Sequence, residues 1–375
     1  MLENCKNYDK DIRYTGANDL CNEIVKSADP LEESLEKRIC SAFVQHLEDS
    51  SVEVKSNAVR CIQRVSSKIR ESNLTMIVQK LADAIISGNE ETLDIFSLTV
   101  RGIINEAHER SANSLITTLY PSIYKGIEAG TVPVKEECLE ICTDLFKQFG
   151  LIILRQQGLI NREQLMKAIN SQLTAGSTPS LRKRASYAMG AFAVILNQAS
   201  LNQLCSLLLT KIKTGTNKAD TVTQIQCLSM VAKAIGSKLA PFLDKIVPLL
   251  LEIMIQLDKG SSVDIDNELS EACLATLQSI IRRCPREVTP YVPKTLEYAL
   301  DLLSYDPNYI YDDNEDEEME EEVEDWGSDF DDEEQEKADD DDDTSWKVRR
   351  GAIHVIEAVV KTKPDFLKII IESHS

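Results

Sequence analysis

The chain has 375 residues, 43% of them hydrophobic, so it is long enough to bury a large core. Its 14 glycines and 11 prolines are too few for a turn-rich β architecture. The formal net charge is −21, but it is carried by one acidic block, and the rest of the chain has neither a net positive charge nor a basic stripe, which argues against nucleic acid as a direct partner.

The amino-terminal segment, "MLENCKNYDKDIRY", carries charges where a secretory signal needs an apolar core. The longest apolar run, "IVPLLLEIMIQL", is interrupted by Glu252 and is too short to span a bilayer. We therefore expect a soluble intracellular protein without a membrane partner.

A short pattern recurs along the chain: an apolar residue, then a basic residue, then a small residue three positions after the basic one. In its clearest copy, which begins at Val54, the side chains of Ala58, Cys61, Ile62 and Val65 share one helical face. The clear copies begin at Val54, Val134, Leu181 and Val348, and weaker copies begin at Ile12, Ile95, Ile225 and Leu269. In chain order, the spacings between the eight are 42, 41, 39, 47, 44, 44 and 79 residues.

Each copy follows a second amphipathic segment, such as "LEKRICSAFVQHLED" before Val54. Two helices joined by a short polar turn and repeated every ~40 to 47 residues are typical of HEAT or armadillo repeats. We expect Asp49, in the turn before Val54, and Lys55, in the helix that follows, to pair with the backbone or with each other. The sequence predicts an all-α, HEAT/armadillo-type α-solenoid of about eight helical hairpins, a shape that suits binding rather than catalysis.

The block from Asp312 to Asp343 holds 22 acidic residues and one lysine, so its charge of −21 equals that of the whole chain. It lies in the one irregular spacing, and removing its 32 residues from 79 leaves 47, which predicts an insertion between two regular repeats. We expect disorder, because such a block repels itself and cannot bury a core. It is either a solvated spacer or a surface for a basic partner. The predicted organisation is a solenoid over residues 1–305, an acidic loop over 306–344, and a further repeat helix with the start of an incomplete repeat over 345–375.

Residues three, six and ten positions after each anchor form a row opposite the apolar face of the second helix. Because second helices usually line the concave side of such rods, we expect several of these side chains to contact a partner. For any single residue, the alternative is a solvated helix face. The candidates are Asn18, Asn57, Arg60, Arg64, Arg184 and Tyr187, in rows that also contain Thr15, Asn22, Glu137, Glu140, Asp144 and Ala191.

Aromatic residues flank the acidic block on both sides. They are either a recognition site or packing that anchors the ends of the loop. Under the packing interpretation, Trp346 is a hydrophobic staple at a helix start, and Thr344 or Ser345 is the N-cap. The candidate recognition residues are Tyr305, Asn308, Tyr309 and Trp346.

No catalytic, cofactor or metal site is expected. The histidines at positions 46, 108, 354 and 374 are far apart, and none has a recognised partner at a suitable spacing. Phosphate-binding glycine motifs are absent from the sequence. The ten cysteines form no CxxC pair, so reduced core thiols are expected rather than disulfides or zinc ligands. The sequence therefore favours a binding protein over an enzyme.

Four segments, in this order, carry more specific information: "DKDIRYTGANDL" (Asp9 to Leu20), "RRCPREV" (Arg282 to Val288), "LSYDPNYIYDD" (Leu303 to Asp313) and "DDDDTSWKVRRGA" (Asp340 to Ala352). They resemble the cullin-associated, neddylation-dissociated family, long HEAT solenoids also described as TATA-binding-protein-interacting proteins. The acidic insert lies between the same two motifs in that family. The resemblance covers the whole of this chain but only the amino-terminal third of the family's length.

The resemblance implies a partner and a role. Family members wrap around a cullin that lacks its ubiquitin-like modifier, together with its RING subunit, block modification of the cullin and promote exchange of substrate receptors. Their amino-terminal repeats engage the cullin's carboxy-terminal region and RING side. The implied role is docking, in the cytoplasm and nucleus, with a second chain able to supply the carboxy-terminal repeats. Two alternatives stay open: a nuclear transport receptor of the importin-β type, and an acidic chaperone for histones or other basic proteins.

Overall fold

In a computed structural model, the described residues are 1–27, 31–156, 158–174, 176–215, 217–257, 263–305 and 344–366. Within these ranges the chain forms α-helices and short 3-10 turns but no strand. The α-helices are α1 (Lys10–Lys26), α2 (Glu33–His46), α3 (Val52–Val65), α4 (Glu71–Ser87), α5 (Leu93–Glu106), α6 (Ala112–Ala129), α7 (Val132–Arg155), α8 (Arg162–Ser171), α9 (Pro179–Ala193), α10 (Gln198–Thr214), α11 (Lys218–Ile235), α12 (Leu243–Leu257), α13 (Val263–Arg283), α14 (Val292–Asp301) and α15 (Ser345–Thr362).

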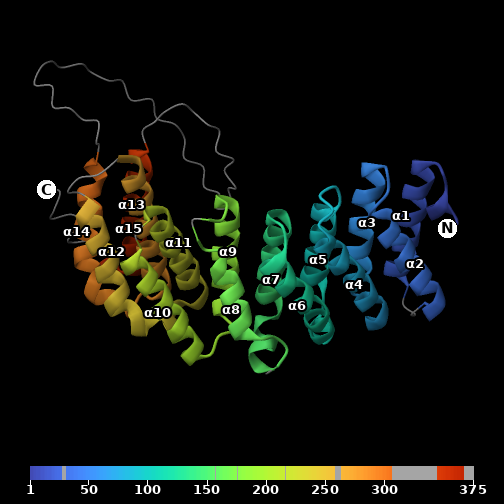
Figure 1. Ribbon diagram of the computed structural model, residues 1–375, viewed down its shortest axis with the longest axis horizontal. Coiled ribbons are helices and arrows are strands. Elements are labelled where there is room, and N and C mark those ends of the chain that lie inside the picture. The colour runs from blue at the N-terminus through green and yellow to red at the C-terminus, as the bar shows by residue number, and fades with distance from the viewer. Residues whose placement is uncertain are drawn as a thin grey trace, which may run out of the picture.

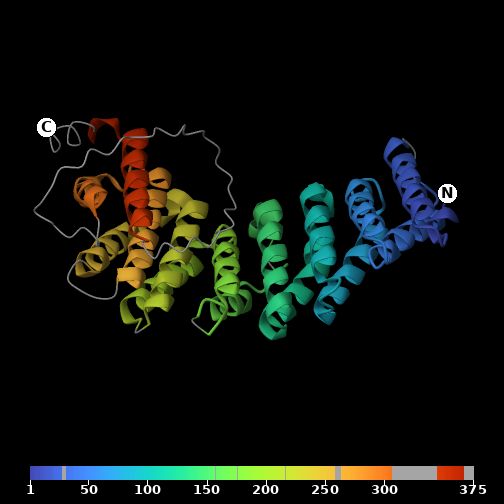
Figure 2. The same cartoon turned by 90° about the horizontal axis from the view of Figure 1, so that it is seen from above.

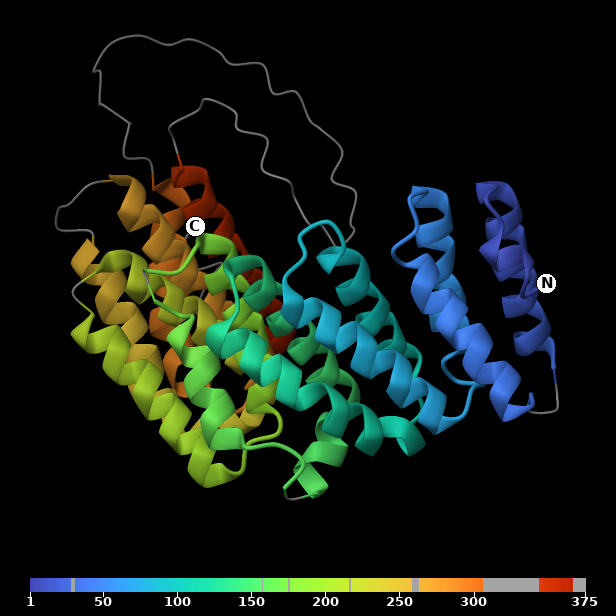
Figure 3. The same cartoon turned by 45° about the vertical axis from the view of Figure 1, so that its right-hand side comes forward.

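The helices form two layers. The odd-numbered helices stack on one another in chain order from α1 to α15, and α2, α4, α6 and α8 stack beside them in the second layer. Each even-numbered helix also packs on the odd-numbered helix that follows it, from the α2–α3 pair to the α14–α15 pair. Figures 1 and 2 show an elongated rod with α1 and α2 at one end and the group α12 to α15 at the other, and Figure 3 shows the same stack turned. The predicted all-α solenoid of helical hairpins is confirmed.

The register of the predicted repeat is also confirmed. The eight anchors, from Ile12 to Val348, lie one on each odd-numbered helix. Val54 and Ile225 are typical, because both are buried against neighbouring helices. Ile12 is 38% exposed. Each of the other odd-numbered helices packs against the even-numbered helix that precedes it, whereas α1 packs on that side against the short turn Asn4–Lys6.

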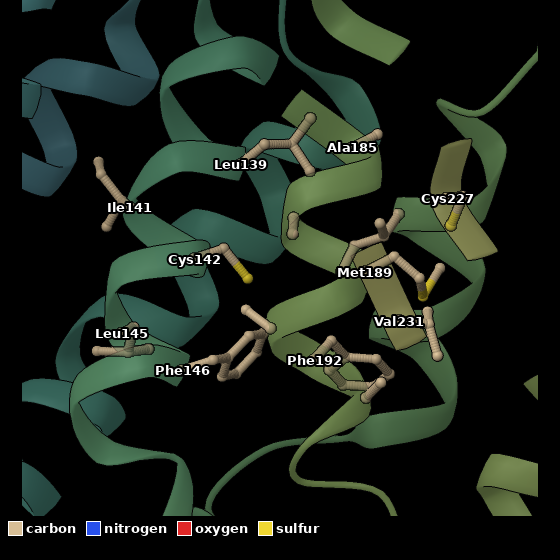
Figure 4. Packing of buried hydrophobic residues seen from close by; sticks show 14 of the residues in the cluster. Leu139, Ile141, Cys142, Leu145, Phe146, Ala185, Met189, Phe192, Cys227 and Val231 are labelled. Atoms are coloured by element: carbon tan, nitrogen blue, oxygen red, sulfur yellow. The ribbon is translucent and has the colours of Figure 1, made fainter. Parts of the chain in front are cut away.

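The core is continuous along the rod. Figure 4 shows a section of it, where Cys142 and Phe146 of α7 meet Met189 and Phe192 of α9. The Phe146 and Phe192 rings are tilted, with centroids 5.5 Å apart, a favoured aromatic geometry. All ten cysteines are buried free thiols, so the prediction of core thiols rather than disulfides is confirmed.

Several helix boundaries follow from local sequence. The side-chain oxygens of Asn161, Thr178 and Asn197 accept hydrogen bonds from backbone amides three residues later, at 3.1, 3.2 and 2.8 Å. These bonds satisfy amides that have no partner within the first helical turn. At the end of α4, Gly88 takes a left-handed φ of 71°, which glycine adopts without steric cost.

The acidic block connects the two helices of one repeat. Because α14 packs on α15 as a hairpin, residues 306–343 link partners within that hairpin, so the expected insertion between two repeats is corrected to an insertion within one. The expected disorder of the block lies outside the described residues. So does the expected next helix beyond Phe366. Within the described ranges, no helix is both long and apolar enough to cross a membrane.

Candidate interaction surface

The odd-numbered helices present a polar face, and several residues of the predicted rows lie on it. Arg60 and Arg64 of α3 are exposed, and Asn18 of α1 is half-buried. The Arg60 guanidinium donates to the Tyr14 hydroxyl at 3.3 Å, which joins the row of α3 to helix α1. These contacts give one surface that crosses from repeat to repeat.

Asn57 does not lie on this surface, although its row position predicted exposure. Its side chain is only 3% exposed, and its amide donates to the Tyr14 carbonyl at 3.1 Å. The rows were chosen to lie opposite the face that α3 buries against α2. Helix α1 covers a second side of α3, and Asn57 lies on that side. Asn57 therefore joins two repeats and is corrected from a contact candidate to a packing residue.

Asp49, in the turn before α3, pairs with the backbone and with an arginine of the preceding repeat. Its two carboxylate oxygens accept hydrogen bonds from Arg13 of α1, each at 2.7 Å, and one also accepts from the Ser51 amide at 2.9 Å. The structural role predicted for Asp49 is confirmed for this residue. Of the two expected kinds of partner, the backbone is confirmed for Asp49 by the Ser51 amide, and Arg13 of the preceding repeat is a partner that the sequence did not predict.

In the middle of the rod, a charged network joins α5, α7 and α9. Glu140 of α7 is held between two arginines, Arg101 of α5 and Arg184 of α9. Arg101 also binds Asp144 at 2.7 Å, and Arg184 binds Glu137 at 3.2 Å. Burial raises the pKa of Glu137 above its usual value. The predicted rows of α7 and α9 are thus brought together by ion pairs.

Above this network lies an open groove of about 460 Å³ between α7 and α9. Lys147 of α7 and Lys183 of α9 are exposed on its lining, and the Tyr187 ring beside them is 46% exposed. Among the described residues, neither lysine forms an ion pair. The full lining is Arg101, Glu140, Thr143, Asp144, Lys147, Ser180, Lys183, Arg184 and Tyr187.

The sequence rows missed several residues of this surface. Leu98, which is 53% exposed, and Arg101 lie three and six positions after the anchor Ile95. Counting three and six positions from Ile95, as was done for the clearer copies of the repeat, would have identified Leu98 and Arg101. Lys147 and Lys183 are outside any row, because the groove is shaped by the spacing between two helices rather than by the register of one.

The two ends of the acidic block are tied to the same side chain, Asn267 of α13. The Tyr305 hydroxyl donates to the Asn267 side-chain oxygen at 3.0 Å, and the Asn267 amide donates to the Thr344 hydroxyl at 2.9 Å. Arg349 adds a bond to the Tyr305 carbonyl at 2.7 Å. For Tyr305 the packing interpretation fits this geometry. Asn308 and Tyr309 lie outside the described residues.

Trp346 differs from the expected hydrophobic staple. It is 44% exposed, and the cationic groups of Arg350 and Lys347 lie 4.9 and 5.8 Å from its ring centroid. Thr344 precedes α15, but its side chain makes no capping hydrogen bond. Ser345 instead accepts from Arg349 at 2.8 Å. Thr344 is therefore the N-cap residue, as expected, but without a capping hydrogen bond, whereas the staple expectation is wrong and Trp346 stays available on the surface.

No metal site emerges from the described side chains. Within the described ranges, no group of three or more His, Cys, Asp or Glu residues could hold an ion. His46 is buried, and one ring nitrogen lies 2.6 Å from the Cys5 carbonyl. His354 lies 3.7 Å from Glu357 on the same helix and is partly exposed.

Solved structures with this arrangement define the class. The match to importin β covers 99% of this chain and 43% of the importin β chain, at 14% identity and a TM-score of 0.56. The match to Kap121p, in its complex with Nup53p, covers 97% of this chain and 33% of the Kap121p chain, at 12% identity and a TM-score of 0.59. At these identities the likeness is one of fold. The chain is a HEAT-type α-solenoid.

No protein-family model matches the chain, whereas individual relatives do. Cullin-associated NEDD8-dissociated protein 1 of Drosophila melanogaster is 32% identical over 98% of this chain and 28% of its own length. Cullin-associated NEDD8-dissociated protein 2 of Mus musculus is 30% identical over 98% of this chain and 29% of its own. The chain is therefore related, over nearly all its residues, to the cullin-associated NEDD8-dissociated proteins, and it spans 28 to 29% of the length of these two relatives.

A further relative is itself named as part of a longer unit. "Cullin-associated NEDD8-dissociated protein 1, C-terminal part" of Emericella nidulans is 43% identical over 109 residues, which make up 26% of this chain and 10% of that protein.

Proposed function

We propose that this chain is a docking protein for cullins that lack their ubiquitin-like modifier. Through contacts with the cullin's carboxy-terminal region and its RING subunit, it controls ligase assembly, cullin modification and exchange of substrate receptors. The observation that carries the proposal is the relationship over 98% of the chain to proteins named as cullin-associated. A non-catalytic, cofactor-free role in the cytoplasm and nucleus belongs to the same proposal.

The face of the odd-numbered helices is the proposed docking surface. Arg60 and Arg64 are exposed there, and Arg184 and Tyr187 lie on the groove further along the same face. A rod offers such a face over several repeats, so many modest contacts add up to a stable complex. Charges at its rim are expected to set the orientation and rate of binding more than the total affinity.

The proposal also includes a partner chain that carries further HEAT repeats. Trp346, Ile353 and Val360 are 44%, 54% and 36% exposed and lie seven residues apart on α15. Seven residues are nearly two helical turns, so these side chains form one stripe. Gly351, toward the other side of the helix, faces Leu274 of α13. The stripe has the character of a stacking surface, and the relative named as a C-terminal part supports a separate chain as its occupant.

The proposal is tested by binding the purified chain to a cullin–RING complex with and without the attached modifier. We expect binding to the unmodified complex, and weaker binding after modification. A charge reversal at Arg60 and Arg64 should slow association with the complex at least about tenfold. The matched control reverses Lys37 and Arg38, which are exposed on α2 in the other layer, and should leave binding unchanged.

The open alternatives give different outcomes in a pull-down from the protein's own cell extract. Recovery of the Ran GTPase without cullin would move the function to nuclear transport. Recovery of histones, lost when residues 312–343 are deleted, would favour a chaperone for basic proteins. Recovery of unmodified cullin with its RING subunit, largely retained after that deletion, supports docking through the helical face.

A further inference from the structure

The α7–α9 groove has a rigid floor and an unneutralised rim. On the floor, Glu140 binds both Arg101 and Arg184, so three successive repeats are cross-linked beneath the groove. The arginine charges are engaged by carboxylates of α7, and a preformed floor reduces the ordering cost of binding. The floor is therefore a support, and the rim decides which ligand the groove accepts.

The rim charges come from two lysines on facing helices. Lys147 of α7 and Lys183 of α9 line the same groove, and among the described residues neither has a carboxylate partner. Placing two ammonium groups around one groove raises the local positive potential, which favours an anionic ligand. Charge complementarity thus selects an acidic occupant.

Tyr187 adds an apolar and aromatic element. It follows Lys183 by four residues on α9, which places both on the same helix face. Its ring is 46% exposed, and it lines the groove with the hydroxyl-bearing residues Thr143 and Ser180. A tyrosine offers contact area together with a polar tip, a combination common where peptide segments bind.

We propose that this groove binds an acidic peptide segment of a partner protein. The ammonium groups of Lys147 and Lys183 pair with two neighbouring carboxylates of the segment, while Tyr187 packs against its backbone or an adjacent side chain. The floor carboxylates Glu140 and Asp144 are engaged by Arg101 and Arg184, which leaves the two rim lysines to bind the carboxylates of the segment. The inference rests on the proposed function only for the identity of the partner.

The test measures fluorescence anisotropy of a labelled peptide of eight glutamates added to the full chain. Reversal of both rim lysines, Lys147→Glu with Lys183→Glu, should weaken binding at least ~tenfold. The matched control reverses Lys125 of α6 and Lys213 of α10, which are exposed on the other layer and change the net charge equally. Binding by this control should stay within about twofold of the parent chain.

Equal loss in both double variants would overturn the proposal, because it would assign binding to net charge alone. Tyr187→Ala should weaken binding as well, and an octaglutamine peptide should not bind. A single-stranded oligonucleotide that binds more tightly than the glutamate peptide would also overturn it. The same measurements are repeated on a chain that lacks residues 312–343, because this acidic block could compete with the peptide for the groove. If the peptide binds neither the full chain nor the shortened chain, the proposal is wrong. Because no cullin is present, failure here is distinguishable from failure of the docking proposal.

Discussion

Arg13 of α1 binds both carboxylate oxygens of Asp49, 36 residues further along the chain, with its Nε and one terminal nitrogen each at 2.7 Å. The pair is largely shielded, since the side chains are 14% and 9% exposed. A bidentate arginine–carboxylate contact fixes orientation as well as distance. This bond therefore sets how α1 lies on the α2–α3 hairpin.

Replacing Asp49 by Asn should lower the free energy of unfolding by about 1–2 kcal/mol, because one charged acceptor is lost while Arg13 stays in place. Urea denaturation followed by circular dichroism measures this change. The control Glu53→Gln removes the exposed partner of Lys10 in the same pair of helices and should have no measurable effect. Equal effects of the two substitutions would contradict the assignment.

The same pair predicts a pH dependence. The hydrogen bond from Arg13 lowers the pKa of Asp49, against the opposing effect of burial. A carboxylate with a lowered folded-state pKa stabilises the fold above its unfolded pKa of about 3.9, and the stabilisation is lost as pH falls through the folded value. The difference in stability between the parent and Asp49→Asn should therefore be full at neutral pH and shrink below about pH 4. A difference that stays constant down to acid unfolding would exclude this linkage.

Glu36 of α2 is a buried carboxylate that joins two repeats. Its oxygens accept hydrogen bonds from the Arg70 amide at 2.8 Å, the Arg70 guanidinium at 2.6 Å and the Asn73 amide group at 2.6 Å. Glu36→Gln places an amide donor against these donors, which should cost about 2–4 kcal/mol of unfolding free energy. Glu33→Gln, at an exposed site on the same helix, is the control for denaturation experiments and should be neutral. A neutral Glu36→Gln would show that the contacts contribute little.

Gly190 lies where α9 and α11 approach closely. A Cβ added there would lie 2.9 Å from the Met230 carbonyl oxygen and 3.0 Å from the carbonyl carbon, and backbone atoms cannot turn away. On helix propensity alone, Gly→Ala should stabilise by about 1 kcal/mol. We expect Gly190→Ala to destabilise by about 1–3 kcal/mol, because overpacking outweighs propensity. Thermal unfolding of the variant and the parent chain shows whether the substitution stabilises or destabilises the fold. Gly176→Ala, whose Cβ would meet only the Thr174 hydroxyl at 4.0 Å, should not destabilise.

The buried thiols should differ in their rate of alkylation. A hydrogen bond with Cys61 lowers the pKa of Cys21, and burial raises that of Cys205 to about 12. Both side chains are inaccessible, so labelling requires local opening, which is easiest at the end of a stack. We expect Cys21 on α1 to be labelled first, at a rate that rises with pH, and Cys205 among the last. Peptide mapping by mass spectrometry after timed alkylation provides the order. Early labelling of Cys205 would contradict it.

Much of the fold could be predicted because the signals are local. The apolar spacing around Val54 or Leu181 depends on residues within one helix, and it gave both the helix and the face that it buries. The ten core cysteines follow the same pattern. The family relationship likewise depends on short segments, such as the one around Trp346, and needs no coordinates.

The candidate surface depended on contacts that cross repeats. The sequence placed Glu140 and Arg184 in rows but could not show that one arginine from each side holds Glu140, because the partners are 39 and 44 residues away. Burial of Asn57 and exposure of Trp346 were misassigned for the same reason: each depends on what a neighbouring helix covers.

The sequence by itself determined the repeat, the register of its helices and the separation of a neutral body from one acidic block, since each is set by residues close together along the chain. Only the tertiary structure decided which charges pair, where the groove between α7 and α9 opens, and that Tyr305 and Thr344 meet at Asn267 across the insertion. Stacking of successive hairpins fixes these features, because it brings together side chains some 40 residues apart, as the 43 residues between Arg101 and Asp144 illustrate.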